Sequence, residues 1–232
     1  MRRYLAVVLL SICGVQPSGF AAEISFSPAG GGFGRVQTSV QSLLEQRWQH
    51  VVRQGLDISC GSATLSTILR YQFGDEVSER VLLAELFKRL RPEEVAKRGG
   101  FSLLDLKDVA TKLGYQVKGY KLSFDQLVAL GTPAIVPIVI RGSKHFIVLR
   151  GMVGDRVVLA DPAFGTTMVS QEQFERLWVT KTAMVITRPG AKPPASQLAI
   201  APNELAAVEP REALRSLLNR PAAYTVVDPD AF

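Results

Sequence analysis

Apolar residues recur at helical spacing in the first half of the chain and gather into short runs in the second half. Spacings of three and four residues, typical of one face of an α-helix, follow residues 60, 78 and 102. β-Branched runs then predict strands at 115–120, 134–140, 145–150, 156–160 and 182–187. Helices first and strands later predict an α+β fold, in which N-terminal helices pack on a C-terminal antiparallel sheet.

Capping and breaking residues predict where these elements begin and end. Three capping boxes predict helix starts: Ser102 with Asp105, Ser123 with Gln126, and Ser170 with Gln173. Pro137 interrupts the apolar run 134–140, and because proline cannot donate to a ladder, it places that strand at an edge or a bulge. Helical spacing also predicts a first helix over residues 36–52.

The two ends of the chain differ from this central region. Arg2 and Arg3 precede an apolar run over residues 5–15, and small residues follow at 18, 19, 21 and 22, which is the pattern of a secretory signal peptide. We expect cleavage after Ala21, with an uncleaved anchor as the alternative. The apolar run is short for a transmembrane helix, so no stable membrane span is expected after cleavage.

These features divide the chain into four parts. Residues 1–21 are the signal peptide, 22–48 a flexible leader with the first helix, 49–188 the folded domain, and 189–232 a Pro- and Ala-rich extension with one short helix, 210–219. A chain of 232 residues can bury one substantial core. We therefore expect a single domain with appended segments.

Charge excludes one class of partner. Without residues 1–21 the chain has 25 Lys and Arg against 21 Asp and Glu, a net charge of +4. The basic residues between 88 and 98 are typical of a solvated helix face, and no aromatic residues are interleaved with them. No nucleic-acid partner is expected.

Cleavage would leave Cys60 as the single cysteine, because Cys13 lies in the signal peptide. A lone thiol in an oxidising compartment is either buried as a small hydrophobe or used in chemistry. One cysteine and two separated histidines give no zinc-binding spacing. Neither a metal nor another cofactor is predicted.

Cys60 opens a predicted helix, and Gln54 precedes it by six residues. The positive end of the helix dipole favours a thiolate over a thiol. The amide of Gln54 and the backbone N–H of Cys60 are donors suited to a developing oxyanion. This stretch therefore predicts the nucleophile and the oxyanion hole of a cysteine hydrolase.

His145 begins a predicted strand and is the candidate base. A five-residue turn over 151–155 would set His145 opposite Asp161, with Ile147 opposite Leu159 and Leu149 opposite Val157 on the same face. Opposed residues have Cβ atoms about 4.5–5.5 Å apart, which suits a hydrogen bond between carboxylate and imidazole. Arg150 and Arg156 would then face solvent.

Alternatives to these assignments remain on sequence grounds. Asp161 precedes Pro162, and Asp-Pro is also an ordinary turn starter. Asp57 lies in the nucleophile's own loop and is interpreted as a loop residue. His50 is interpreted as a structural or surface histidine.

Three motifs carry a resemblance to a known family: Gln54-(five residues)-Cys60-Gly61, Lys144-His145-Phe146-Ile147-Val148, and Ala160-Asp161-Pro162-Ala163. Together they resemble the motifs of the bacteriocin-processing (double-glycine leader) papain-like cysteine peptidases, over residues 49–188. The resemblance implies a papain-like fold. It also implies a triad of Cys60, His145 and Asp161, with Gln54 in the oxyanion hole.

The signal peptide and the lack of a transporter region resemble a narrower group. These are the stand-alone periplasmic peptidases encoded with functional-amyloid (Fap-type) secretion systems. That resemblance implies a periplasmic enzyme, a polypeptide substrate, and components of an amyloid or peptide export system as partners. An acyl transferase with the same triad, or a peptidase-fold binding module of a secretion assembly, would fit the same residues.

Overall fold

The computed structural model describes residues 22–26, 36–40, 42–190 and 196–200, which fall into two units divided after Ser42. In the first unit, β1 (Ala22–Phe26) pairs antiparallel with β2 (Val36–Val40). The prediction of a helix over 36–52 is therefore wrong for residues 36–40, and it is also wrong for 48–52, because the helix that forms ends at Arg47. Valine and threonine alternate there with glutamine and serine, a pattern that favours a strand.

Two predicted features lie in parts of the chain that the structure does not describe. The signal peptide at 1–21 and the helix at 210–219 lie outside the described residues. Within the described ranges, no helix has the length and apolar character needed to cross a membrane.

The second unit begins with helices and continues with strands. The helices α1 (Leu43–Arg47), α2 (Cys60–Phe73), α3 (Glu79–Phe87), α4 (Pro92–Arg98) and α5 (Leu103–Lys112) come first. Strands follow as β3 (Gln116–Lys121), β4 (Ala134–Ile140), β5 (Ser143–Val153), β6 (Arg156–Asp161), β7 (Gly165–Ser170) and β8 (Thr182–Thr187). Two short helices, α6 (Phe124–Ala129) and α7 (Gln171–Leu177), lie between strands. The predicted α+β arrangement is confirmed.

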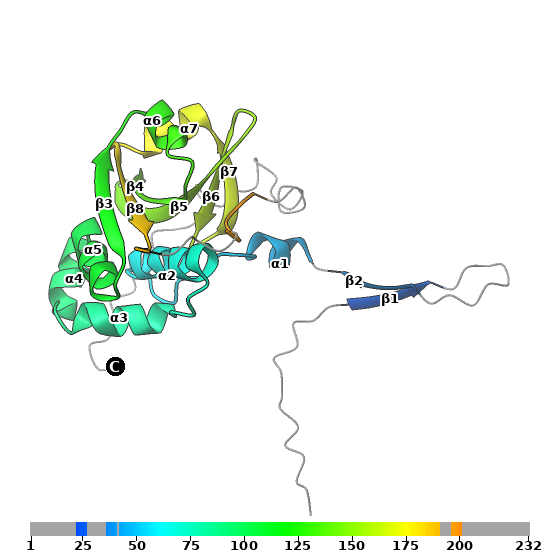
Figure 1. The fold of residues 1–232 in the computed structure, drawn as a ribbon, viewed down its shortest axis with the longest axis horizontal. Coiled ribbons are helices and arrows are strands. Elements are labelled where there is room, and N and C mark those ends of the chain that lie inside the picture. Colours follow the sequence, from blue (N-terminus) through cyan, green and yellow to red (C-terminus); the bar gives the residue numbers. More distant parts are fainter. Residues whose placement is uncertain (1–21, 27–35, 41, 191–195, 201–232) are drawn as a thin grey trace, which may run out of the picture. The chain divides into compact units, whose positions relative to one another are not determined.

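The six strands form one antiparallel sheet in the order β3-β8-β4-β5-β6-β7. Figure 1 shows α2 to α5 on one side of the strands and α6 and α7 on the other. Alternate residues of β5 consequently enter different cores. Phe146 and Val148 pack with α2, α3 and α5, whereas Ile147 and Leu149 pack with α6 and α7.

The position of β4 corrects one expectation. The strand lies between β8 and β5, so the edge position predicted from Pro137 is wrong. β4 pairs with β8 in register through one residue pair, Ile135 with Met184. Pro137 therefore lies beyond the paired part of β4 and β8, where no hydrogen bond to β8 calls for the N–H that proline lacks.

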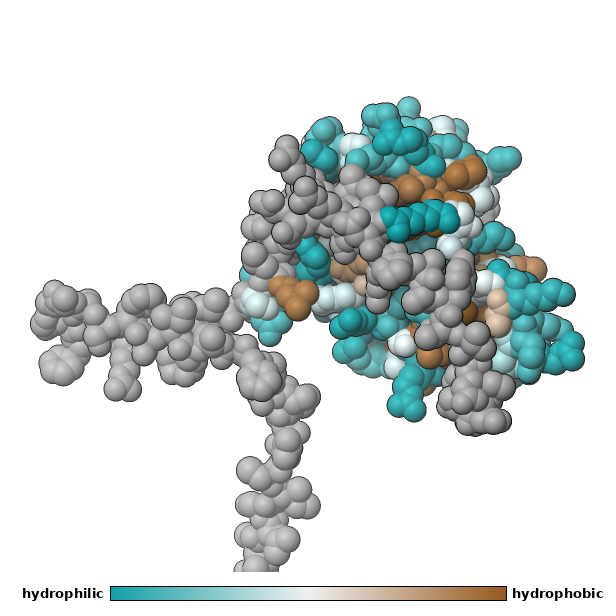
Figure 2. All heavy atoms as spheres, turned by 180° about the vertical axis from the view of Figure 1, so that it is seen from behind, coloured by the Kyte–Doolittle hydropathy of each residue, from teal (hydrophilic) through white to brown (hydrophobic). Residues whose placement is uncertain are grey.

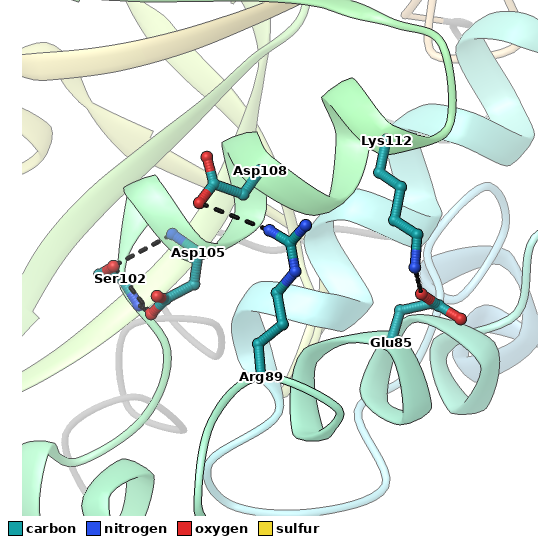
Figure 3. Close-up of polar contacts among 6 residues, drawn as sticks. All are labelled: Glu85, Arg89, Ser102, Asp105, Asp108 and Lys112. Carbon is teal, nitrogen blue, oxygen red and sulfur yellow. Dashed lines mark hydrogen bonds and ion pairs between the residues drawn. The ribbon is translucent and has the colours of Figure 1, made fainter.

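The three capping boxes are confirmed, at the starts of α5, α6 and α7. Figure 3 shows the first of them, Ser102 with Asp105, beside two ion pairs that join the α3 region to α5. Lys112 Nζ lies 2.5 Å from Glu85 Oε2, and Arg89 lies 3.8 Å from Asp108. These two ion pairs thus tie the α3 region to α5.

Apolar side chains on the surface are scattered. Figure 2 shows one face that is mainly hydrophilic, with small separate hydrophobic areas. The large exposed apolar residues come from several elements: Leu44, Val81, Leu104, Leu113, Val153 and Val179. Single exposed apolar residues of this kind are normal on a protein surface.

Residues 196–200 pack against the domain. Arg150, predicted to face solvent, is 7% exposed and donates to the carbonyl oxygens of Leu198 and Ala199 at 2.9 and 3.0 Å. Leu198 is fully buried in the core beside α2, and Gln197 N donates to Tyr71 O at 2.9 Å. The prediction that Arg150 faces solvent is wrong, because residues 196–200 cover the part of β5 that carries it.

We predict that Leu198→Ala destabilises the protein by about 2–5 kcal/mol, because it empties a fully buried site. Urea unfolding measures the change. Leu104→Ala is the control: this leucine is 63% exposed, and its loss should cost less than about 0.5 kcal/mol. Equal midpoints for Leu198→Ala and wild type would show that the segment does not belong to the fold in solution.

Candidate active site

Cys60 is the first residue of α2 and is 6% exposed. Ser59 occupies the N-cap position but makes no side-chain capping bond. Its Oγ instead donates to Leu56 O at 2.8 Å and accepts from Leu56 N at 3.0 Å. The Ser59 side chain therefore does not cap the first-turn N–H groups of α2, which lie at the end of the helix that carries the thiol.

Gly61 lets α2 approach the sheet closely. A Cβ at this position would lie 3.2 Å from the methyl carbons of Leu106 and 3.3 Å from the ring of Phe146. Phe146 follows His145 in β5, just as Gly61 follows Cys60 in α2. This contact brings the start of α2 to the start of β5.

His145 and Asp161 form the predicted pair. His145 Nε2 lies 2.9 Å from Asp161 Oδ1, with 15% of the imidazole side chain and 3% of the carboxylate exposed. Asp161 Oδ1 also accepts from Ala163 N at 2.8 Å, which fixes the carboxylate in the turn between β6 and β7. The carboxylate is therefore positioned before any substrate binds.

The register that suggested this pair is wrong. Leu149 faces Leu159 instead of Val157, because β5 and β6 are joined by a short turn after Val153 and β5 has a bulge between Leu149 and Gly151. The shift amounts to two residues, so His145 stays on the face of Asp161. β7, which was not predicted, continues the chain after the Asp161 turn.

The pKa of His145 is strongly perturbed. Burial alone would lower it, but the charge of Asp161 and hydrogen bonds with Asp161 and Cys60 outweigh this and raise the pKa from 6.5 to about 10. Asp161 occupies Nε2, so Nδ1 is the ring nitrogen left to face Cys60. An imidazolium at this position favours a thiolate partner.

Gln54 is held in a tight loop before α2. Its Nε2 donates to Leu56 O at 2.9 Å, and its backbone N donates to Pro162 O at 2.9 Å. Nε2 carries a second N–H, which remains for another acceptor. Among the described residues, Gln54 Oε1 is a buried atom without a hydrogen-bond partner.

A pocket of about 320 Å³ lies between this loop and the Asp161 turn. It is lined by residues 53–57 with Pro162 and Ala163. The pocket adjoins Gln54 and is a candidate for binding part of a polypeptide.

The remaining candidates lie outside this arrangement. Asp57 is exposed on the rim of the pocket, and the carboxylate that meets His145 belongs to Asp161. The ring of His50 packs edge-on against Tyr71, with ring centroids 5.3 Å apart. In the described part of the chain, no three His, Cys, Asp or Glu side chains gather in a way that could hold a metal ion.

A helix-borne thiol, a strand-borne imidazole and a buried carboxylate are the parts of a cysteine peptidase. The chain belongs to the peptidase C39 family, whose model matches residues 48–190.

Two curated relatives carry the name "Probable functional amyloid protease FapD". The protein from Pseudomonas aeruginosa is 38% identical over 158 residues, which cover 68% of this chain and 69% of that protein. The protein from Pseudomonas fluorescens is 33% identical over 178 residues, 77% of this chain and 76% of that protein.

A solved structure supports the fold. The peptidase domain of Streptococcus ComA, described as a bifunctional ABC transporter of a quorum-sensing pathway, superposes with a TM-score of 0.51 at 24% identity. The match covers 60% of this chain and 97% of that domain.

We predict that His145 stays protonated through neutral pH and titrates near 10, as the structure indicates. The folded pKa exceeds the unfolded value, so the stability that the protonated ring contributes is complete below pH 6.5 and is lost as the pH rises through about 10. NMR of the imidazole carbons measures the pKa, and His50→Gln leaves one histidine in the chain. Asp161→Asn should lower the pKa of His145, whereas a wild-type titration near 6.5 would contradict the pair.

Proposed function

We propose that this peptidase is a periplasmic cysteine endopeptidase with Cys60 as nucleophile, His145 as base and acid, and Asp161 as the residue that orients His145. The N–H of Cys60 and the amide of Gln54 form the oxyanion hole. The observation that carries the proposal is the position of His145, which hydrogen-bonds Asp161 and Cys60.

In the proposed acylation step, the Cys60 thiolate attacks the peptide carbonyl carbon, and the displaced electron pair moves to the carbonyl oxygen. The oxyanion accepts from Cys60 N–H and Gln54 Nε2–H. As the C–N bond breaks, the His145 imidazolium gives its proton to the leaving amine. A thioester on Cys60 and a neutral imidazole result.

Deacylation reverses the roles. His145 takes a proton from water, whose oxygen attacks the thioester, and collapse of the second oxyanion releases the acid and the thiolate. Asp161 holds the proton on Nε2 throughout, so Nδ1 is the nitrogen that exchanges protons with substrate and water. The carboxylate thereby selects the productive tautomer.

The substrate class and the compartment follow from different observations. The names of the two Pseudomonas relatives support a polypeptide substrate from an export or functional-amyloid secretion pathway. The pattern at residues 1–21 supports export to the periplasm.

Expression with residues 1–21 intact, followed by mass analysis of the periplasmic fraction, should give a chain that begins at Ala22. A full-length chain confined to the cytoplasm would contradict this localisation.

We predict different losses for a variant without the nucleophile and a variant without an oxyanion donor. Cys60→Ala should abolish turnover of a fluorogenic peptide selected from a library by the wild-type enzyme, since no thioester can form. Gln54→Ala should lower kcat by about 10²–10³, the usual effect of losing one oxyanion donor. Product masses that include one added water would confirm hydrolysis.

Alkylation provides an independent check of the thiol. Iodoacetamide should label wild-type Cys60 at neutral pH faster than a free cysteine, and His145→Ala should remove that advantage. Leu104→Ala, on the exposed face of α5, serves as the control. Wild-type labelling at the rate of a free cysteine would favour a buried structural thiol.

A further inference from the structure

Glu79 makes a contact that the proposed mechanism does not use. Its carboxylate oxygens accept from the backbone N–H of Gly55 at 3.0 and 3.1 Å, across 24 residues of sequence. Gly55 directly follows Gln54. The contact therefore ties the loop of the oxyanion donor to the first residue of α3.

Gln54 is bracketed by two such ties. Its own N–H donates to Pro162 O, in the turn that carries Asp161, and the next N–H donates to Glu79. Both peptide groups that flank the Gln54 side chain are thus anchored on other elements. Because the backbone is held on both sides of Gln54, the Cα from which the side-chain amide extends has little freedom to move.

The side chain of Gln54 depends on the same loop. Its Nε2 donates to Leu56 O, and the same carbonyl oxygen accepts from Ser59 N and Ser59 Oγ at 3.1 and 2.8 Å. The second oxyanion donor, Cys60 N–H, lies on α2 instead. The distance between the two donors therefore depends on how the loop is held relative to the helix.

Glu79 is well suited to hold it. As the first residue of α3, it benefits from the positive end of that helix, which favours a carboxylate. A Cβ on Gly55 would lie 3.3 Å from Glu79 Oε2, so a glycine there allows the close approach. A charge-assisted bond from a helix is a firmer support than a bond to another loop.

We propose that Glu79 is a positioning residue that sets the place of the Gln54 amide in the oxyanion hole. This inference rests on the proposed function of Gln54. Glu79 is not among the residues that line the pocket beside Gln54, and its carboxylate meets the backbone of Gly55. Its loss changes the chemistry through Gln54 and leaves the thiol and the imidazole as they are.

The proposal separates two reactions of the same cysteine. Peptide cleavage develops an oxyanion, whereas alkylation by iodoacetamide displaces iodide at a methylene carbon and develops none. Glu79→Ala should lower kcat for the fluorogenic peptide about ten- to a hundredfold with little change in KM. The rate of Cys60 alkylation should stay within twofold of wild type.

Three further variants test the route. Glu79→Gln keeps an oxygen that accepts from Gly55 N–H and should restore most of kcat. Glu76→Ala removes an equal charge from an exposed side chain that pairs with Arg70, and should leave kcat unchanged. In the Gln54→Ala background, Glu79→Ala should cause no further loss, because both changes remove the same donor.

The outcomes distinguish this proposal from the proposed function. Full activity in Glu79→Ala, or losses that multiply in the double variant, would overturn the positioning role while Gln54→Ala stays impaired. Parallel losses of kcat and alkylation rate would show a general disturbance of α2 and would also overturn it. Full activity in Gln54→Ala would instead overturn the oxyanion role on which both rest.

Discussion

The close contact between α2 and β5 at Gly61 is the constraint on which the site depends. A Cβ on Gly61 would lie only 3.3 Å from the ring of Phe146, and the residues before these two are Cys60 and His145. An apolar contact thus sets the distance between two polar groups one position away. Apolar packing does not depend on the charge of the thiol or the imidazole, so the contact can hold through the ionisation changes that the proposed mechanism requires.

Hydrogen bonds then join the site residues into one connected set. His145 bonds Asp161, the turn after Asp161 supplies the carbonyl of Pro162, and that carbonyl receives the N–H of Gln54. The loop from Gln54 leads directly into Cys60. Each candidate residue is therefore supported by the element that carries the next, and a shift of one is transmitted to the others.

Signals between neighbouring residues predicted most helices and strands and the candidate site residues. The pairing of strands that are distant in sequence could not be predicted from these signals. The capping boxes, the spacing of Gln54 and Cys60, and the strands β4 and β8 depend on neighbouring residues. The β5–β6 register depends on a turn length and a bulge, which alternation cannot reveal. The His145–Asp161 pair was still predicted correctly, because the predicted β5–β6 register was shifted by two residues, which is one full period of side-chain alternation in a strand. The burial of Arg150 depends on residues 196–200, which are distant in sequence.

The N-terminus of α2 shows why a broken local rule is informative. Serines cap α3, α5, α6 and α7 with their side chains, in backbone conformations with ψ between 156° and 168°. Ser59 has ψ of 10°, and its hydroxyl turns back to Leu56. A capping hydroxyl accepts from the N–H of the second or third helical residue, here Gly61 or Ser62, so a cap at Ser59 would leave Cys60 N–H as it is. The hydroxyl is used instead on Leu56, whose carbonyl oxygen also accepts from Gln54 Nε2, so α2 gives up a side-chain cap and the loop that holds Gln54 gains a support.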